Sequence, residues 1–448
     1  MEGRALMQKN DIFEIEITGM TDDGSGVGRA EGIAVFVPYT IVGEVVRAII
    51  IKVNKSFAVG KLLDIIKPSE HRIKSDCDYF YKCGGCQLRH MDYEAELDFK
   101  YNNVKECISR IGGINIPISP VVCADHRSRY RNKVQLPVSE KGIGFYRRNS
   151  HDVIDMEDCL LQNEYVADII NTIRVWMRKF NIEPYNEKEN SGVLRHVYIR
   201  SGKSGIMVSL VSNTGNLPHA DDIVSMLRDL NLSITSIVCN INTQSTNVVL
   251  GKENRVLWGD GYIRDNIGDA EFKISPNSFY QVNNSQTQRL YEIVRRMANL
   301  TGKEIVWDIY CGIGTIGQYI AKDAQKIIGI EIVPQAVEDA RKNAELNKIS
   351  NSEYHCGLAE KIAPKLAGNA DAPDVVILDP PRKGCEEVLI DTVVKLKPKR
   401  IVYVSCKPST LARDLKYLEG KGYKTCEIVP VDMFPGTCHV ETVALLIK

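Results

Sequence analysis

Cys406 is the side chain of this sequence that is best placed for nucleophilic chemistry. The residues at 401–404 are apolar and mostly β-branched or aromatic, which is typical of a short buried strand, and Pro408 opens a polar helical pattern. Cys406 therefore falls in a strand-to-helix turn, where side chains of an open α/β sheet face the ligand. We expect Lys407 and the start of the helix to lower the pKa of this thiol from its usual value of about 8.5. The alternative is a small buried side chain that closes the strand.

Three other cysteines have the spacing of metal ligands. Cys77, Cys83 and Cys86 form the pattern C-x5-C-x2-C, and two glycines between the last two let the backbone turn. Cys159 is the next plausible cysteine and would be the fourth ligand. Four thiolates suit either tetrahedral zinc or an iron–sulfur cluster. Zinc ribbons usually pair two C-x2-C hairpins, so this spacing favours a [4Fe–4S] cluster.

Residues 303–384 have the pattern of a nucleotide-binding sheet. The motif G-x-G-x-x-G spans 312–317, directly after a predicted strand that contains Asp308, and Glu331 ends the next predicted strand. In this arrangement a carboxylate binds the hydroxyls of a ribose. A further strand at 375–378 leads into Asp379, and the two prolines that follow make a rigid turn directed into the same cleft. A dehydrogenase would not need this acidic turn.

The N-terminal residues, from 13 to about 66, contain short alternating or β-branched runs separated by turn clusters. Several short strands at this spacing predict a small β-barrel. The order of its segments resembles the TRAM domain, an oligonucleotide-type barrel found on RNA-modifying enzymes. Protein binding or simple stabilisation of the chain are the alternatives for a bare barrel.

The region that follows predicts a second, α+β domain with cationic and aromatic residues. Arg127, Arg129, Arg131 and Lys133 alternate along the chain, so on a strand they would share one face. Aromatic and cationic residues mix again at 144–148. Such interleaving suits phosphate neutralisation combined with base stacking, whereas a solvated strand face is the alternative. Helical and strand patterns then alternate to residue 272.

Composition limits the class of protein. The chain has 448 residues, 44% of them hydrophobic and 25% charged, and its formal net charge is zero. It is long enough for two to four domains, and any nucleic-acid binding must come from local patches rather than total charge. No signal peptide and no long apolar segment are present, so we expect a cytoplasmic protein without membrane contact. Thirteen cysteines in a reducing compartment favour metal binding and catalysis over disulfides.

Five motifs together give a resemblance that covers essentially the whole chain. They are FYQVN at 279–283, DIYCGIG at 308–314, DPPRKG at 379–384, VSCKP at 404–408 and HVETV at 439–443. The sequence resembles S-adenosylmethionine-dependent RNA 5-methyluridine methyltransferases, the TrmA superfamily, whose members methylate 23S rRNA or tRNA. The resemblance implies roles for individual residues: Gln281, Tyr310, Glu331 and Asp379 bind S-adenosylmethionine, Cys406 is the nucleophile, Glu441 is the base, and Cys77, Cys83, Cys86 and Cys159 hold a [4Fe–4S] cluster.

The resemblance also implies a three-domain organisation. We expect a TRAM-type barrel at 1–68, a cluster-bearing α+β domain at 74–92 and 125–272, and a Rossmann-like methyltransferase domain at 93–124 and 273–448. The rRNA branch of the family carries barrel and cluster together, which favours a 23S rRNA substrate. We also expect a monomer. Two alternatives remain: a tRNA uridine methyltransferase, and a non-catalytic iron–sulfur protein that binds RNA or senses redox state.

Overall fold

The computed structural model describes residues 7–366 and 372–448, which divide into two compact units. Unit 1 contains the chain up to Asn103 together with Phe434–His439, and unit 2 contains Val104–Met433 and Val440–Lys448. Residues 1–6 of the predicted barrel segment and 367–371 of the predicted methyltransferase segment lie outside the described residues. Among the described residues, no helix has the length and apolar character needed to cross a membrane.

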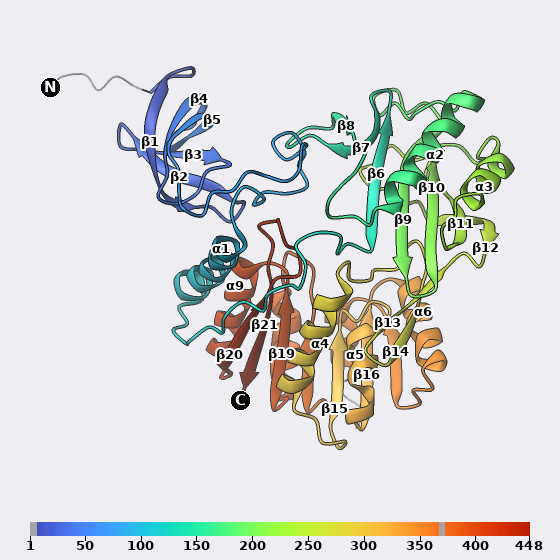
Figure 1. Cartoon of the computed structure of the whole chain (residues 1–448). Helices are drawn as coiled ribbons and strands as arrows, with labels where there is room; N and C mark the ends of the chain where they lie inside the picture. The colour runs from blue at the N-terminus through green and yellow to red at the C-terminus, as the bar shows by residue number, and fades with distance from the viewer. Residues whose placement is uncertain (1–6, 367–371) are drawn as a thin grey trace. The chain divides into compact units, whose positions relative to one another are not determined.

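Unit 1 contains a closed β-barrel with the strand order β1-β2-β3-β5-β4, drawn in blue in Figure 1. Its strands are β1 (Ile12–Met20), β2 (Ser25–Ala30), β3 (Ile33–Pro38), β4 (Val45–Val53) and β5 (Phe57–Lys67). Alternate residues such as Ile15, Ile17, Val35 and Val37 are buried inside the barrel, because side chains alternate between the two faces of a strand. Where β1 and β2 cross, a Cβ on Gly28 would lie 2.2 Å from Ile15 Cγ2, so only glycine fits. The predicted barrel is confirmed.

The rest of unit 1 joins two parts of the chain that are far apart in sequence. Helix α1 (Tyr93–Glu106) begins here, and the segment 434–439 returns to it from near the C-terminus. The backbone N–H groups of Gln87 and Leu88 both donate to the carbonyl of Gly436, at 3.1 Å each. The N–H of Gly436 in turn donates to Glu96 Oε1 at 2.7 Å. Glu96 and Lys100 form a fully buried ion pair whose Nζ and Oε1 are 2.7 Å apart.

The first sheet of unit 2 has the order β12-β11-β10-β9-β6-β7-β8. Its strands are β6 (Lys133–Ser139), β7 (Gly142–Tyr146), β8 (Val153–Asp155), β9 (Leu194–Gly202), β10 (Gly205–Ser212), β11 (Ile234–Ile241) and β12 (Glu253–Gly259). The amphipathic helices α2 (Tyr165–Phe180) and α3 (Ala220–Arg228) bury Ile173, Trp176 and Ile223 in the core of this sheet. This layer is the α+β domain expected from the sequence.

The second sheet of unit 2 has the order β17-β16-β15-β18-β19-β21-β20, parallel except for β21. Its strands are β15 (Ile305–Ile309), β16 (Lys326–Glu331), β17 (Ser352–Cys356), β18 (Val375–Leu378), β19 (Arg400–Ser405), β20 (Lys424–Val431) and β21 (Glu441–Ile447). Its helices are α4 (Asn284–Ala298), α5 (Thr315–Ile320), η2 (Ala321–Asp323), α6 (Pro334–Leu346), α7 (Ala359–Leu366), α8 (Glu387–Leu396) and α9 (Pro408–Gly420). The strands are buried over most of their length, as expected for a parallel sheet covered on both faces.

Smaller elements complete unit 2. The hairpin of β13 (Ile263–Ile267) and β14 (Ala270–Ile274) precedes α4, and the π-helix η1 (Cys107–Gly112) packs against α9. Pro334 and Pro408 each occupy the first turn of a helix, a position where the missing N–H costs nothing. Residues 93–103 belong to unit 1 and 104–124 to unit 2, while the boundary between the α+β and methyltransferase domains stays a prediction.

Candidate active site

Cys406 lies between the end of β19 and the start of α9, in the strand-to-helix turn that the sequence predicts. Ser405, the last residue of β19, pairs with Thr442 of the antiparallel strand β21. Because the strands are antiparallel, Cys406 and Glu441 occupy the next position of the same register. Cys406 is partly buried, and Glu441 is only 5% exposed. The structure therefore brings the predicted nucleophile and the predicted base together.

Burial and neighbouring carboxyl groups raise the pKa of both Cys406 and Glu441. Burial raises the pKa of Glu441 to about 8, the negative charge of Asp379 adds to the rise, and Arg382 opposes it. Burial also raises the pKa of the Cys406 thiol to about 11, with further contributions from Glu441 and Asp379 against Arg382. The prediction that Lys407 and the helix start lower this pKa is wrong. Lys407 is exposed, whereas the thiol itself is partly buried next to the charges of Glu441 and Asp379.

Three more carboxyl groups lie in or directly after the neighbouring strands. Asp308 is in β15, Glu331 ends β16, and Asp379 follows β18. Burial and repulsion from Asp308 raise the pKa of Asp379 to about 7. Burial raises that of Asp308 to about 7, even though its Oδ2 accepts the N–H of Gly317 at 2.9 Å. Such a group of acids at the carboxyl ends of parallel strands is suited to a ligand that carries positive charge and hydroxyl groups.

The glycine turn holds the first strand against the second. The two oxygens of Glu331 accept the N–H groups of Gly312 and Val333, at 3.1 and 2.9 Å. Gly314 has φ of 81°, a left-handed conformation that favours glycine. A Cβ on Gly317 would lie 2.9 Å from both Asp308 Oδ2 and Ile327 Cγ2, so glycine is required where α5 meets β15. Glu331 and the glycine turn therefore form one hydrogen-bonded assembly.

Tyr310 and Gln281 are the other two residues that the resemblance assigns to the cofactor. Tyr310 has φ of 68°, which is uncommon for a residue with a side chain and often marks a functional turn. Its hydroxyl donates to Glu360 Oε1 at 3.4 Å, and burial raises its pKa. Gln281 is 8% exposed and precedes α4, where its carbonyl accepts a hydrogen bond from Asn132 Nδ2 at 2.9 Å. Tyr310 adjoins the glycine turn, whereas Gln281 is anchored to the segment before β6.

The turn after Asp379 is fastened to α9 by residues that the sequence does not single out. Buried Asp414 accepts the N–H of Cys385 at 2.9 Å and the hydroxyl of Tyr403 at 2.5 Å. The guanidinium of Arg413 donates to the carbonyl of Lys383 at 2.9 Å. Helix α9 thus supports the acidic turn. Only a folded structure reveals this role, because an Arg-Asp pair in a polar helix carries no distinctive signal.

The four cysteines predicted to bind a metal do not form a recognisable metal site among the described residues. Cys77, Cys83 and Cys86 belong to unit 1 and Cys159 to unit 2. The N–H of Gly85 donates to Cys83 Sγ at 3.3 Å, and none of the thirteen cysteines, all of which the structure describes, forms a disulfide. Within residues 7–366 and 372–448, no three His, Cys, Asp or Glu side chains are grouped to hold a metal ion. The cluster is therefore not confirmed.

The predicted basic face of a strand is not formed. Strand β6 begins only at Lys133, and Arg129 has φ of 59°, so the arginines do not alternate along an extended strand. The guanidinium of Arg129 pairs with Asp158, with two N–O distances of 2.7 Å. Burial, with repulsion from Arg200 and Arg131, lowers the pKa of Lys133 to about 8. Arg129 is therefore paired within the domain, and the four cations do not form the strand face that the sequence predicted.

Comparison with known proteins identifies the class to which this arrangement belongs. The family model described as tRNA (Uracil-5-)-methyltransferase matches residues 220–448, and that of the TRAM domain matches residues 8–63. An uncharacterised RNA methyltransferase of Clostridium tetani is 47% identical over 446 residues, covering 98% of this chain and 97% of that protein. A second one, from Clostridium acetobutylicum, is 46% identical over 455 residues and covers 100% of this chain and 99% of its own.

A solved structure agrees with these relatives. It is that of the Pyrococcus abyssi tRNA (uracil-54, C5)-methyltransferase in complex with S-adenosyl-L-homocysteine, which is 31% identical in sequence. It superposes with a TM-score of 0.80 and covers 97% of this chain and 100% of the archaeal chain. The sequence, the fold and the acid–thiol site therefore agree, and the chain belongs to the RNA uracil-5-methyltransferase family, with a TRAM domain at its N-terminus.

Proposed function

We propose that this protein methylates carbon 5 of a uridine in RNA, with S-adenosylmethionine as the methyl donor. The observation that carries the proposal is the position of Cys406 and Glu441, each next to the Ser405–Thr442 pair at the adjoining ends of β19 and β21, where the charge of Glu441 acts on the thiol. A thiol and a carboxyl in one register are the two groups that this reaction needs, a nucleophile and a proton acceptor.

The chemistry assigns one step to each side chain. Cys406, as a thiolate, adds to carbon 6 of the uracil, and the new S–C6 bond leaves an enolate whose carbon 5 is nucleophilic. Carbon 5 then takes the methyl group as the S–CH3 bond of the donor breaks. Glu441, as a carboxylate, removes the proton from carbon 5, and the returning electron pair expels the thiolate of Cys406. The enzyme is regenerated, and the net change is one methyl group for one proton.

The carboxyl groups also match the donor. Gln281, Tyr310, Glu331 and Asp379 are the residues we propose to hold it, as the family resemblance implies. The donor supplies an electrophilic methyl group on a positively charged sulfur, and positive charge favours the ionised forms of carboxyl and thiol groups. In the chain alone Asp379 and Glu441 have pKa values of about 7 and 8, so binding of a cation would shift both groups towards their charged forms.

We propose 23S rRNA as the substrate, because the resemblance implies that barrel and cysteine cluster occur together in the rRNA branch. A tRNA substrate is the second candidate. It is favoured by the archaeal structure, whose title names a tRNA enzyme and whose chain covers 97% of this one. Since that match extends over the barrel region too, the barrel alone does not distinguish the two RNAs.

Methyl transfer to separated RNA pools tests the function. Labelled S-adenosylmethionine would be supplied with unmodified 23S rRNA or unmodified tRNA, and the product nucleosides would be separated. We expect labelled 5-methyluridine in rRNA with the wild-type protein and with Cys426→Ala, whose thiol is exposed on β20, and none with Cys406→Ala. Label in tRNA alone would show that tRNA, the second candidate, is the substrate. No label in either RNA would favour the non-catalytic RNA-binding alternative.

We further propose that Cys77, Cys83, Cys86 and Cys159 are the ligands of a [4Fe–4S] cluster. The support is the sequence spacing, the absence of disulfides at these cysteines, and the N–H contact from Gly85 to Cys83 Sγ, a kind of contact that tunes cluster thiolates. Anaerobic purification followed by iron and sulfide analysis tests this. Stoichiometric zinc without iron would contradict it.

We propose that the enzyme works as a cytoplasmic monomer. Light scattering after size exclusion would then give a mass close to the 50.2 kDa of one chain.

A further inference from the structure

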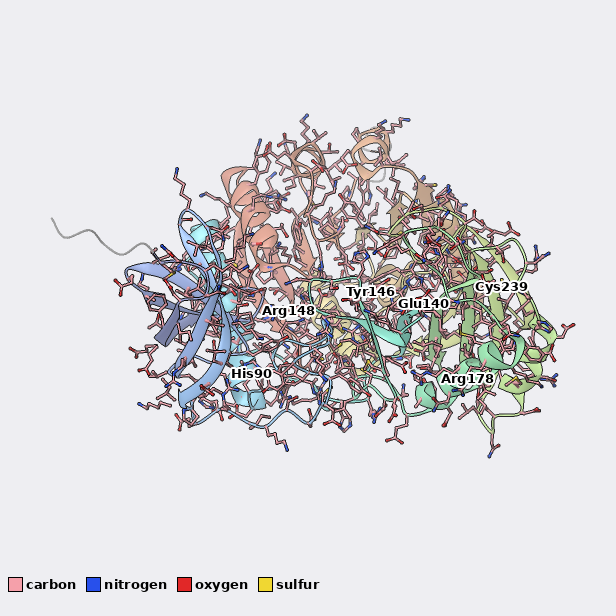
Figure 2. All side chains as sticks on the ribbon, turned by 90° about the horizontal axis from the view of Figure 1, so that it is seen from above. His90, Glu140, Tyr146, Arg148, Arg178 and Cys239 are labelled. Atoms are coloured by element: carbon pink, nitrogen blue, oxygen red, sulfur yellow. The ribbon has the colours of Figure 1, made fainter. Side chains whose placement is uncertain are left out.

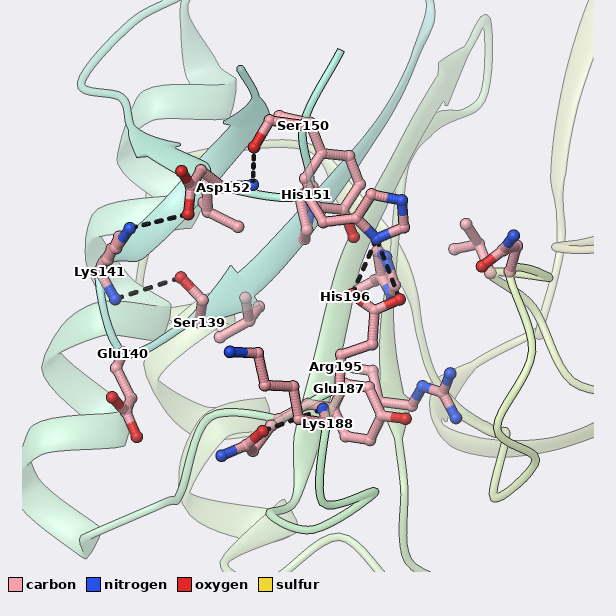
Figure 3. A pocket seen from close by; sticks show the side chains of 18 of the residues that line it. Ser139, Glu140, Lys141, Ser150, His151, Asp152, Glu187, Lys188, Arg195 and His196 are labelled. Carbon is pink, nitrogen blue, oxygen red and sulfur yellow. Dashed lines mark hydrogen bonds and ion pairs between the residues drawn. The ribbon is translucent and has the colours of Figure 1, made fainter. Parts of the chain in front are cut away.

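A polar pocket of about 660 Å³ opens on the first sheet of unit 2. Figure 3 shows its side chains from close by, and Figure 2 labels Glu140 and Tyr146, which lie on the segment of β6 to β8. The residues that matter for what it can bind are Tyr146, His151, Tyr185, Glu187, Arg195 and His196. Its volume is within the range of small-molecule sites. None of the catalytic residues proposed above lines it, because they all follow strands of the other sheet.

Two pairs of flat groups face this pocket. The rings of Tyr146 and His151 have centroids 5.4 Å apart at an interplanar angle of 34°. On another wall, the guanidinium of Arg195 lies 4.2 Å from the ring centroid of Tyr185. Arg195 is held in place by the carbonyls of Asn242 and Gln244, at 2.8 and 2.7 Å. Tyr146 remains 37% exposed, so an aromatic face is available to a planar ligand.

Polar atoms suited to the edge of a planar ligand accompany these faces. His196 is 9% exposed, and its Nδ1 has no hydrogen-bond partner among the described residues. Burial, with repulsion from Arg195, lowers the pKa of His196 to about 4, so its ring is neutral at pH 7. Both carboxylate oxygens of Glu187, which also lines the pocket, lie within hydrogen-bond distance of His151 Nδ1, at 3.0 and 2.9 Å. The ring of His196 and the carboxylate of Glu187 thus place polar groups at the pocket wall beside the aromatic faces.

The charges that line the pocket cancel. Lys141, Lys188 and Arg195 are opposed by Glu140, Asp152 and Glu187. Lys141 is moreover paired with Asp152, with 2.9 Å between Nζ and Oδ1. A phosphate or another anion would therefore meet as many negative as positive groups. The lining favours a neutral, planar ligand with hydrogen-bonding edges.

We propose that this pocket binds one unpaired nucleobase of the substrate RNA, a base other than the uridine that is methylated. This rests on the proposed function, because it requires RNA as the substrate. Recognition of single-stranded RNA by stacking on aromatic and arginine side chains, with hydrogen bonds to the base edge, fits the groups present. A free nucleotide could offer the same base, so the test separates the two sources.

The test is a cycle that combines a protein variant with an RNA change. In the RNA, each nucleotide near the methylated uridine is made abasic in turn, and affinity is measured by fluorescence anisotropy. We expect one position at which the abasic change weakens wild-type binding about tenfold or more. The variant Tyr146→Ala/His151→Ala should bind intact RNA with a similar loss and should lose nothing further at that position.

The matched control is Phe180→Ala/His219→Ala. Phe180 and His219 form the same kind of stacked pair on the same domain, with centroids 4.3 Å apart, and His219 contacts Asp222 as His151 contacts Glu187. This variant should keep both the wild-type affinity and the wild-type abasic effect. Circular dichroism melting would show that both variants fold.

The proposal is overturned if no position shows this coupling while the wild-type protein binds and methylates the RNA. Binding of free mononucleotides, lost in the Tyr146→Ala/His151→Ala variant but without coupling in RNA, would also overturn it in favour of a free ligand. If the wild-type protein methylates no RNA, the proposed function fails separately. The same variants are then compared on short mixed-sequence oligoribonucleotides, where equal binding of wild type and variant would reject the pocket.

Discussion

The carboxyl of Glu441 raises the pKa of the Cys406 thiol, so the base and the nucleophile of this site oppose each other's ionisation in the chain alone. Glu441, with a pKa of about 8, ionises first, and its charge then disfavours the thiolate of Cys406, whose pKa is about 11. The site is therefore at rest when no ligand is bound.

Glu441→Gln should make the thiol of Cys406 more reactive. The substitution removes a negative charge that is present above about pH 8, so the thiol pKa falls and the thiolate fraction between pH 8 and pH 10 rises. Alkylation by iodoacetamide, followed by mass spectrometry of the Cys406 peptide, should then be severalfold faster than in the wild type. Glu427→Gln, which only removes an ion pair with Arg296, should leave the rate unchanged. Equal rates for Glu441→Gln and the wild type would contradict the coupling.

The same substitution should trap a covalent complex with RNA. A glutamine cannot remove the proton from carbon 5, so the reaction stops after methylation with Cys406 still bonded to carbon 6. A denaturing gel with labelled RNA should show a slowly migrating band for Glu441→Gln and none for the double variant Cys406→Ala/Glu441→Gln. If Glu441→Gln turns over at the wild-type rate, another group removes the proton.

Glu441 should also make the folded state less stable as pH rises. Its folded pKa of about 8 lies above the ordinary value of 4.5, so the folded chain binds the extra proton. The associated stability is complete below pH 4.5 and is lost as pH rises through 8. Thermal unfolding of the wild type should lose more stability between pH 5 and pH 9 than that of Glu441→Gln. A parallel pH dependence of the two melting temperatures would refute this.

Asp414→Asn should loosen the acidic turn. The substitution disturbs the hydrogen bonds that Asp414 accepts from the Cys385 N–H and the Tyr403 hydroxyl, and a buried donor left without a partner costs about 1–3 kcal/mol. Urea unfolding should show this loss, and the affinity for S-adenosylhomocysteine should fall as well. Asp391→Asn, which affects an exposed pair with Lys421, should change neither. If Asp414→Asn is as stable as the wild type, Asp414 does not support the acidic turn.

Gly317→Ala should weaken binding of S-adenosylhomocysteine about tenfold or more, because its Cβ would press on Asp308 and Ile327 where overpacking costs about 1–3 kcal/mol. Gly420→Ala serves as the control, since Gly420 ends α9 with no atom within 4 Å of an added Cβ. Isothermal titration of both variants gives the comparison. Equal affinities would show that the turn tolerates a side chain.

The sequence predicts the parts of this molecule that depend on local pattern. The apolar run at 401–404 lies in β19, Pro408 starts a helix, and the glycine motif at 312–317 leads from β15 into α5. Asp379 and Cys406 follow neighbouring strands, as expected of a parallel sheet. These features depend on backbone restrictions and on side-chain periodicity, and both can be read from the sequence alone.

What the sequence could not supply depends on residues brought together by folding. The pKa of Cys406 is raised by burial in the folded chain and by Glu441 and Asp379, which are distant in sequence, whereas the prediction considered only the adjacent Lys407 and the start of the helix. The alternation at 127–133 suggested a strand, but Arg129 adopts a left-handed φ and pairs with Asp158. In both cases tertiary neighbours outweighed sequence neighbours.

The return of residues 434–439 to the N-terminal unit has a consequence for biosynthesis. A ribosome makes the barrel long before Gly436, which lies 340 residues after Glu96, so Gln87, Leu88 and Glu96 have no partner until residues 434–439 have been synthesised. A product that stops before Phe434 would leave the buried Glu96–Lys100 pair without the Gly436 N–H that Glu96 accepts. Unit 1 is thereby complete only after the segment 434–439 has been synthesised, so its folding depends on a part of the chain made much later than the barrel.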